Sequence, residues 1–346
     1  MGEFSALGVD DANARMVGEF FARIDTEAAL PGLEAIVDDF RPDVIVRESW
    51  EFASTLLAQA RGIPIVRVGL GLADVEELSL ALVTPTLHLL RERLGLPADP
   101  EGRRLRDTEY FTTMPAELED PELPLAAAAW RFGRPVGGDV APLPDWWPGN
   151  ADPLVYVTLG TVAGDDHLPY FPRLYRAVID ALAPLRIRLL VTIGDAPDPA
   201  ALRPLPANVH VEPWVAQDAV APQAAAIVCH GGYGSTLGAL AHGVPLVVLP
   251  LFSIDQWANA GAVERCGAGV ALTAERDTRR VLDLPSAATL AELRPAVERV
   301  IGDREHRYRA MDVAEAMRAL PPVDAAVDVL AGMSETLATG RRARRP

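Results

Sequence analysis

Short apolar segments rich in β-branched residues recur along the second half of the chain and alternate with amphipathic stretches. The segments typical of buried strands span residues 154–160, 187–193, 208–213, 225–230, 244–250 and 269–272. Helical patterns separate most of these segments, which indicates parallel strands with helices on both faces of a sheet. The pattern predicts one doubly wound α/β domain over residues 154–330.

A shorter series of the same kind lies in the first part of the chain. Apolar runs at 43–46 and 64–68 flank an amphipathic stretch from Trp50 to Arg61, which predicts a strand, a helix and a second strand. A long and mostly helical segment, 11–40, precedes the first of these strands. We therefore expect residues 1–140 to form a Rossmann-like α/β domain that lacks its opening strand–helix units.

The two series are separated by a segment without hydrophobic periodicity. Residues 134–153 are dense in Pro and Gly, and we place the domain linker at 141–153. A last helix is predicted at about 322–338. The chain ends, over residues 331–346, with the end of that helix and a basic tail.

Composition and charge narrow the classes of function. A chain of 346 residues with 49% hydrophobic content can bury two ordinary α/β cores. Its 48 acidic residues exceed its 32 Lys and Arg residues, for a formal net charge of −16. That balance argues against a protein that holds nucleic acid by its phosphates, so any anionic ligand has to be held by local groups.

Three further features favour a cytoplasmic protein. The longest apolar stretch, 244–252, is far shorter than the roughly 20 residues that a membrane span needs. The N-terminus shows no basic region followed by an apolar core, so no secretory signal is predicted. Two cysteines, Cys229 and Cys266, can build neither a disulfide framework nor a zinc site on their own.

The most distinctive chemistry follows the strand predicted at 225–230. A histidine, His230, ends that strand, and the glycines that follow, including Gly232 and Gly234, lead into a helix. Glycines let the backbone approach a ligand closely, and a helix start directs unpaired N–H groups and a partial positive charge at it. Ser235 adds a hydroxyl donor in the first turn. We therefore predict a phosphate site at this turn.

Other interpretations of the glycines remain open at this point. The simplest is a tight turn that caps a helix beside a buried histidine. Gly232-x-Gly234 also resembles the start of a dinucleotide fingerprint, with Asp255 about 20 residues further on. However, Leu237 occupies the place of the third glycine, and Asp255 falls in the predicted start of the next helix. A Walker loop is excluded because no Lys follows the glycines.

The whole stretch "HGGYGSTLGALAHGVPLVVLPLFSIDQWANA", residues 230–260, resembles the donor-binding signature of nucleotide-sugar-dependent glycosyltransferases of the GT-B fold. That group includes bacterial natural-product and macrolide transferases and the UDP-glycosyltransferases. In such proteins the His and the Gly-Ser turn hold the diphosphate, and the Asp-Gln pair contacts sugar hydroxyls. The resemblance thus implies these donor-binding residues: His230, Gly232, Gly234, Ser235, Asp255 and Gln256. Asn259 is expected only to pack and cap its helix.

The resemblance continues upstream of the glycine turn. In "EPWVAQ" it implies that Trp214 stacks on the nucleotide base and that Gln217 lies beside the ribose, with Val215 between them. An indole face suits this role because it offers a flat apolar platform. The segment "VYVTLGT" resembles the first strand of the donor domain, whose following loop, at Thr161, comes near the phosphate.

The resemblance implies a fold and an activity. The expected fold is GT-B, with two Rossmann-like domains facing a cleft and the first domain incomplete. The expected activity is inverting transfer of a sugar from a nucleotide diphosphate donor to a small hydroxylated, natural-product-like acceptor. Because no Asp-x-Asp triplet occurs in the chain, we expect the donor site to need no metal. No other cofactor and no nucleic-acid partner is expected, and a homodimer is left open.

The catalytic base is not identified by the sequence. Family members begin with a strand followed by Gly-His, and that His is the base, but residues 1–10 provide neither. His88 and Glu48 are weak candidates. The helical spacing of His88 indicates an ordinary half-buried residue, and the position of Glu48 after a strand indicates an acid in a solvated loop. The alternative function is a nucleotide-sugar-binding protein or partner subunit with impaired catalysis.

Overall fold

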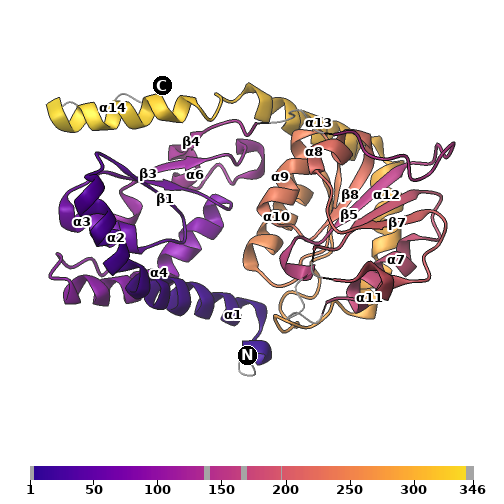
Figure 1. Ribbon diagram of the computed structural model, residues 1–346, viewed down its shortest axis with the longest axis horizontal. Coiled ribbons are helices and arrows are strands. Elements are labelled where there is room, and N and C mark those ends of the chain that lie inside the picture. The colour runs from indigo at the N-terminus through magenta and orange to yellow at the C-terminus, as the bar shows by residue number, and fades with distance from the viewer. Residues whose placement is uncertain (1–3, 136–140, 165–169, 196, 340–346) are drawn as a thin grey trace. The chain divides into compact units, whose positions relative to one another are not determined.

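The computed structural model describes residues 4–135, 141–164, 170–195 and 197–339 (Figure 1). The chain divides into two compact units, each built on its own parallel sheet. The six-stranded unit comprises Met1–Val9 and Val136–Arg318, and the four-stranded unit comprises Asp10–Pro135 and Ala319–Pro346. The α/β class predicted from the sequence is thereby confirmed for both units.

The six-stranded unit contains every strand that the second hydrophobic series predicts. The strands are β5 (Leu154–Thr158), β6 (Arg188–Thr192), β7 (Val209–Glu212), β8 (Ala224–Cys229), β9 (Leu246–Val248) and β10 (Gly269–Ala271). All neighbours pair in parallel, in the order β10-β9-β8-β5-β6-β7. The strand order therefore reverses between β5 and β8, and ligands of open α/β sheets bind outside the carboxyl ends of the strands at such a switch point.

Helices cover both faces of this sheet. Figure 1 shows α9 (Tyr233–Ala241) and α10 (Ile254–Arg265) on one side, with α7 (Arg173–Leu182), α11 (Ala287–Ala291) and α12 (Leu293–Gly302) on the other. The apolar residues of α7 recur at the spacing of one helical face, and they join strand residues such as Val157 and Val191 in the core. The unit also contains η1 (Phe4–Ala6), η4 (Val162–Gly164), η5 (Pro199–Leu202), α8 (Gln217–Val220), η6 (Ala221–Gln223) and α13 (Arg304–Ala319).

The four-stranded unit is also fully parallel. Its strands, in the order β1-β2-β3-β4, are β1 (Ile45–Glu48), β2 (Ile65–Val68), β3 (Glu109–Thr112) and β4 (Trp130–Arg131). The first hydrophobic series predicts β1, α3 and β2, whereas it misses β3 and β4. The helical segment predicted at 11–40 consists of α1 (Val9–Arg15), a π-helical stretch η2 (Met16–Asp25) and α2 (Thr26–Phe40). The other helices are α3 (Ala53–Arg61), α4 (Ala73–Arg93), α5 (Arg103–Arg106), η3 (Ala116–Leu118), α6 (Pro124–Ala128) and α14 (Ala325–Thr339).

The two faces of the four-stranded sheet carry different side chains, because successive residues of a strand point to opposite faces. Tyr110 packs with residues of α4 and α6 on one face. Val66 and Phe111 lie on the other face, where α14 packs against them. For this reason residues 319–330, which the sequence pattern places with the second domain, belong to the compact four-stranded unit.

The remaining segments add no regular structure. Residues 141–153 of the predicted linker contain neither helix nor strand, and the basic tail at 340–346 lies outside the described residues. Within the described part of the chain, no helix combines the length and the hydrophobicity needed to cross a membrane.

Candidate functional site

The switch point of the six-stranded unit is occupied by a histidine ring held between two glycines. Gly160 follows β5, and His230 follows β8, the neighbouring strand. A Cβ atom built on Gly160 would lie 2.7 Å from Cε1 of His230, and one built on Gly232 would also lie 2.7 Å from the same carbon. Side chains at either position would displace the imidazole, so both glycines are required for its placement.

The turn after His230 has a backbone that suits glycine. Gly231 has a φ of +86°, and a Cβ there would lie 2.7 Å from the backbone oxygen of Gln256. Gly232 is the N-cap of α9, and the first intrahelical bond runs from the Thr236 N–H to the Gly232 oxygen at 3.0 Å. Helix geometry gives the N–H groups of the first turn no acceptor within the helix, so this end of α9 is suited to an anion.

The environment of His230 keeps its ring neutral. Burial lowers the pKa of His230 to about 4, and the Thr158 backbone opposes that shift in part. The Nδ1 atom is buried and makes no hydrogen bond within the described residues. A neutral imidazole carries a single N–H donor, so at neutral pH this ring can hydrogen-bond a phosphoryl oxygen without bearing a charge.

The Asp-Gln pair begins the helix that follows β9. The Oε1 atom of Gln256 accepts hydrogen bonds from the backbone N–H groups of Leu251 at 2.7 Å and Phe252 at 3.1 Å. Asp255 accepts a hydrogen bond from the Ser253 hydroxyl, and burial raises the pKa of its carboxyl. Both side chains thus shape the loop between β9 and α10, and their predicted contact with sugar hydroxyls stays a prediction.

A further residue, Asn259, ties α10 to the glycine turn. Its Nδ2 donates to the backbone oxygen of Gly231 at 2.8 Å, and the side chain is buried. The sequence pattern indicated only packing and capping for this residue. The one signal in the sequence is its spacing, because Asn259 stands four residues after Asp255 and therefore on the same face of the helix.

The segment after β7 contains the residues that are predicted to contact the nucleoside. Trp214 is 65% exposed and so presents its indole to solvent, whereas Val215 is buried. Gln217 begins α8, and its Nε2 donates to the backbone oxygen of Ser235 at 2.9 Å, in the first turn of α9. This bond joins the Trp214 segment to the glycine turn. Thr161 is exposed in the loop after β5.

The predicted donor-binding residues therefore share one edge of the sheet. They all follow the carboxyl ends of strands: Thr161 after β5, Trp214, Val215 and Gln217 after β7, His230, Gly232, Gly234 and Ser235 after β8, and Asp255 and Gln256 after β9. A hydrogen bond links Gln217 with the Ser235 backbone, and Asn259 and Gln256 lie against the Gly231 backbone. Their contacts with a donor stay predictions.

The two weak candidates for the base lie in the four-stranded unit and have local partners. His88, in α4, accepts a hydrogen bond on Nδ1 from the Asp99 N–H at 3.4 Å, and its Nε2 is 3.5 Å from Glu92. Glu48, at the end of β1, is exposed and accepts a bond from the Trp50 N–H at 2.9 Å. These contacts account for both side chains, so the base remains unassigned.

A buried polar cluster of the same unit escaped the sequence analysis. Arg67 is fully buried over the ring of Tyr110, and none of its side-chain nitrogens has a hydrogen bond among the described residues. Burial raises the pKa of Glu76, which accepts bonds from the Ser49 hydroxyl at 2.7 Å and the Leu70 N–H at 3.2 Å. The sequence alone does not indicate that a charged residue in a strand will be buried by the rest of the fold.

Another buried acid, Glu119, supports the start of α4. It accepts a hydrogen bond from the Ala73 N–H at 2.9 Å, and Arg131 lies 4.0 Å away. Burial raises the pKa of Glu119 to about 7, and the Ala73 N–H and Arg131 limit the shift. This carboxyl therefore titrates near neutral pH.

Two parallel α/β units with a glycine turn at a switch point are the arrangement expected of a glycosyltransferase of the GT-B class. Family models agree and cover most of the chain. The Erythromycin biosynthesis protein CIII-like N-terminal domain matches residues 3–127, and the corresponding C-terminal domain matches residues 176–333. The chain belongs to this EryCIII-like glycosyltransferase family.

Individual proteins support that placement. The chain is 30% identical over 342 residues to 4'-demethylrebeccamycin synthase of Lentzea aerocolonigenes, an alignment that covers 87% of this chain and 76% of that protein. The crystal structure of the glycosyltransferase SnogD from Streptomyces nogalater matches with a TM-score of 0.68 and 28% identity, covering 93% of this chain and 80% of SnogD. The glycosyltransferase VinC, solved in complex with DTDP, shares the fold with a TM-score of 0.70 at 22% identity, covering 94% and 80% of the two chains.

Proposed function

We propose that this protein transfers a sugar from a nucleotide diphosphate donor to a small hydroxylated acceptor, with inversion at the anomeric carbon. The observation that carries the proposal is the neutral His230 beside the glycine turn at the switch point. Membership of a natural-product glycosyltransferase family supports it, as does the DTDP bound to VinC, which has the same fold.

In the proposed reaction the acceptor oxygen attacks the anomeric carbon from the face opposite the diphosphate. The bond between that carbon and the diphosphate oxygen breaks, and the acceptor proton passes to a general base. The first turn of α9 and the N–H of His230 stabilise the charge that develops on the leaving diphosphate. Trp214 would stack on the nucleotide base of the donor, while Asp255 and Gln256 would contact its sugar.

The test is donor binding in the whole protein, measured by calorimetry with UDP and dTDP. Replacing His230 with Ala should weaken binding by about 1–3 kcal/mol, the scale of a hydrogen bond to a charged group. His210→Ala is the matched control, because His210 lies on the edge strand β7 and pairs with Glu212 at 2.7 Å. An affinity that His230→Ala leaves unchanged would refute the phosphate site.

The alternative function is nucleotide-sugar binding without efficient transfer. It is favoured by the local contacts of His88 and Glu48, which leave neither as an evident base. A missing general base costs a factor of about 10²–10⁴ in rate. Donor binding without transfer would therefore support the alternative, whereas transfer at about 1 s⁻¹ or more would support the enzyme and make His88 and Glu48 the first residues to substitute.

A cytoplasmic location and independence from metal are proposed together with this function, and a homodimer is left open. In the described residues no group of three His, Cys, Asp or Glu side chains could hold a metal ion. The helix terminus and His230 would take over the part that a cation plays at other diphosphate sites.

A further inference from the structure

A recess lies at the amino ends of the strands in the four-stranded unit. Its volume is about 920 Å³, within the range of small-molecule sites. The residues just before β2 and β3 line it, including Pro64 and Thr108. The turn at His230 belongs to the other unit and lies at the carboxyl ends of strands, and none of the predicted donor-binding residues lines this recess.

Apolar side chains from three parts of the unit form the wall of the recess. They are Ile63 before β2, Leu125 and Ala128 of α6, and Met333 of α14. Such a wall removes the surface of an apolar ring system from water, which gives a ligand most of its binding free energy.

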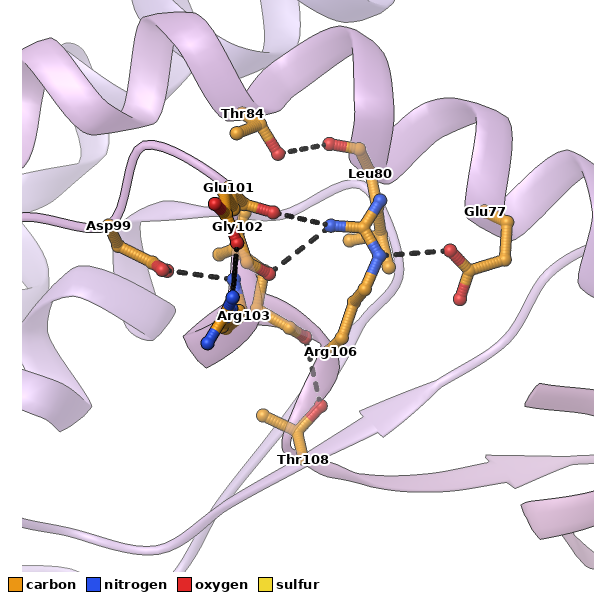
Figure 2. A network of polar contacts seen from close by, with 10 residues as sticks. Glu77, Leu80, Thr84, Asp99, Glu101, Gly102, Arg103, Arg106 and Thr108 are labelled. Carbon is orange, nitrogen blue, oxygen red and sulfur yellow. Dashed lines mark hydrogen bonds and ion pairs between the residues drawn. The ribbon is translucent and has the colours of Figure 1, made fainter. Parts of the chain in front are cut away.

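The loop that forms the rim is fixed by Arg106 (Figure 2). Its Nε donates to Glu77 at 3.0 Å, and its Nη1 donates to the backbone oxygens of Glu101 at 3.1 Å and Gly102 at 3.3 Å. Gly102 has a φ of +63°, and a Cβ there would lie 3.2 Å from Cγ2 of Thr84, so the loop is pressed against α4. Arg106 is therefore engaged in holding the loop.

Hydrogen bonds fix the backbone of Arg104 but not its side chain. Its N–H donates to Asp99 at 3.0 Å, and its oxygen accepts a bond from Gln59 at 3.4 Å. Arg104 lines the recess, and its guanidinium makes no hydrogen bond or ion pair within the described residues. Asp107, also exposed at the rim, can accept a hydrogen bond from a ligand hydroxyl.

We propose that this recess is a second small-molecule site, which takes an apolar ring compound bearing one carboxylate or sulfonate. The ring lies against the apolar wall and the anionic group pairs with Arg104. A guanidinium presents several donors in a plane and so matches such an oxyanion well.

The probe is 1-anilinonaphthalene-8-sulfonate, an aromatic sulfonate whose fluorescence rises on binding. It is titrated into the folded whole protein, with excess UDP or dTDP present to occupy a donor site. One saturable class of site is expected, and Arg104→Gln should weaken it about tenfold. Arg103→Gln is the matched control, because Arg103 is an exposed neighbour that pairs with Glu101 and does not line the recess.

A second pair of variants tests the position of the probe. Ala128→Trp fills the recess and should abolish saturable binding, whereas Ala127→Trp, at an exposed neighbour outside the lining, should leave it intact. Equal affinities of the Arg104→Gln and Arg103→Gln proteins, displacement of the probe by the nucleotide, or the absence of saturable binding would each overturn the proposal. If Ala128→Trp fails to fold, as thermal unfolding will show, the arginine pair decides.

Discussion

The contact between His230 and Gly232 can be tested by adding one methyl group. Gly232 has a φ of −63° and a ψ of 148°, so alanine can adopt its backbone conformation without strain. The new Cβ, however, would lie 2.7 Å from Cε1 of His230 and nearer still to Nε2. Because ordinary carbon contacts begin near 3.4 Å, the imidazole has to move by roughly 1 Å.

The expected cost of Gly232→Ala has two parts. Overpacking against the ring should cost about 1–3 kcal/mol in the free energy of unfolding. Loss of glycine at the N-cap of α9 should add about 0.5–1 kcal/mol, which is independent of the histidine. Only the first part should vanish when His230 is replaced by Ala. Gly234→Ala is the matched control, since a Cβ at Gly234 meets nothing within 4 Å and alanine is the better helix former.

The assay is urea unfolding of five proteins: the wild type, the single variants Gly232→Ala and His230→Ala, the double variant that combines them, and the control Gly234→Ala. The double-mutant cycle should give a coupling energy of about 1–3 kcal/mol, because the added methyl costs less once the ring is gone. If Gly232→Ala costs the same with and without His230, the imidazole does not lie against Gly232 and the reasoning is refuted.

Two other predictions concern pH and metal. Glu119 has a pKa of about 7 when folded and a usual value of 4.5, so the folded state binds more protons between these values and its stability falls as pH rises through them. Glu119→Gln should therefore stabilise the protein by up to about 3 kcal/mol at about pH 8 and by much less at about pH 5, while the exposed neighbour Glu117→Gln should show no such difference in thermal unfolding. Removal of divalent metal with EDTA should leave the calorimetric affinity for UDP or dTDP unchanged, and a loss of binding would show that the phosphate site needs a cation.

The sequence predicts the six-stranded sheet better than the four-stranded one for a physical reason. Central parallel strands are covered on both faces and therefore appear as continuous apolar runs, as in residues 154–158 and 224–229. By contrast, β3 begins with Glu109 and β4 has only two residues. Pairing with neighbours that are distant in the sequence makes these segments strands, and local pattern does not contain that information.

The candidate site was predictable where it depends on local geometry. The glycines and the helix start around His230 are visible in the sequence because both act over a few residues. The partners of its amide side chains were not predictable, since Gln217 bonds to the Ser235 backbone and Asn259 to the Gly231 backbone across 18 and 28 residues. Whether an amide binds a ligand or supports a turn depends on which backbone groups the fold brings near it.

The negative net charge of the protein is compatible with an anion site if the site binds the anion only through short-range hydrogen bonds. A net charge of −16 repels a diphosphate at long range, whereas the field of a helix terminus falls off within about one turn. A neutral histidine adds an N–H but no long-range attraction. Such donors are effective only at hydrogen-bonding distance, which requires a backbone that a ligand can closely approach. The glycines at 160, 231 and 232 keep the turn compact, because a side chain at any of them would collide with atoms that already enclose the turn, whereas the backbone at Gly234 is open, since a Cβ there meets nothing within 4 Å.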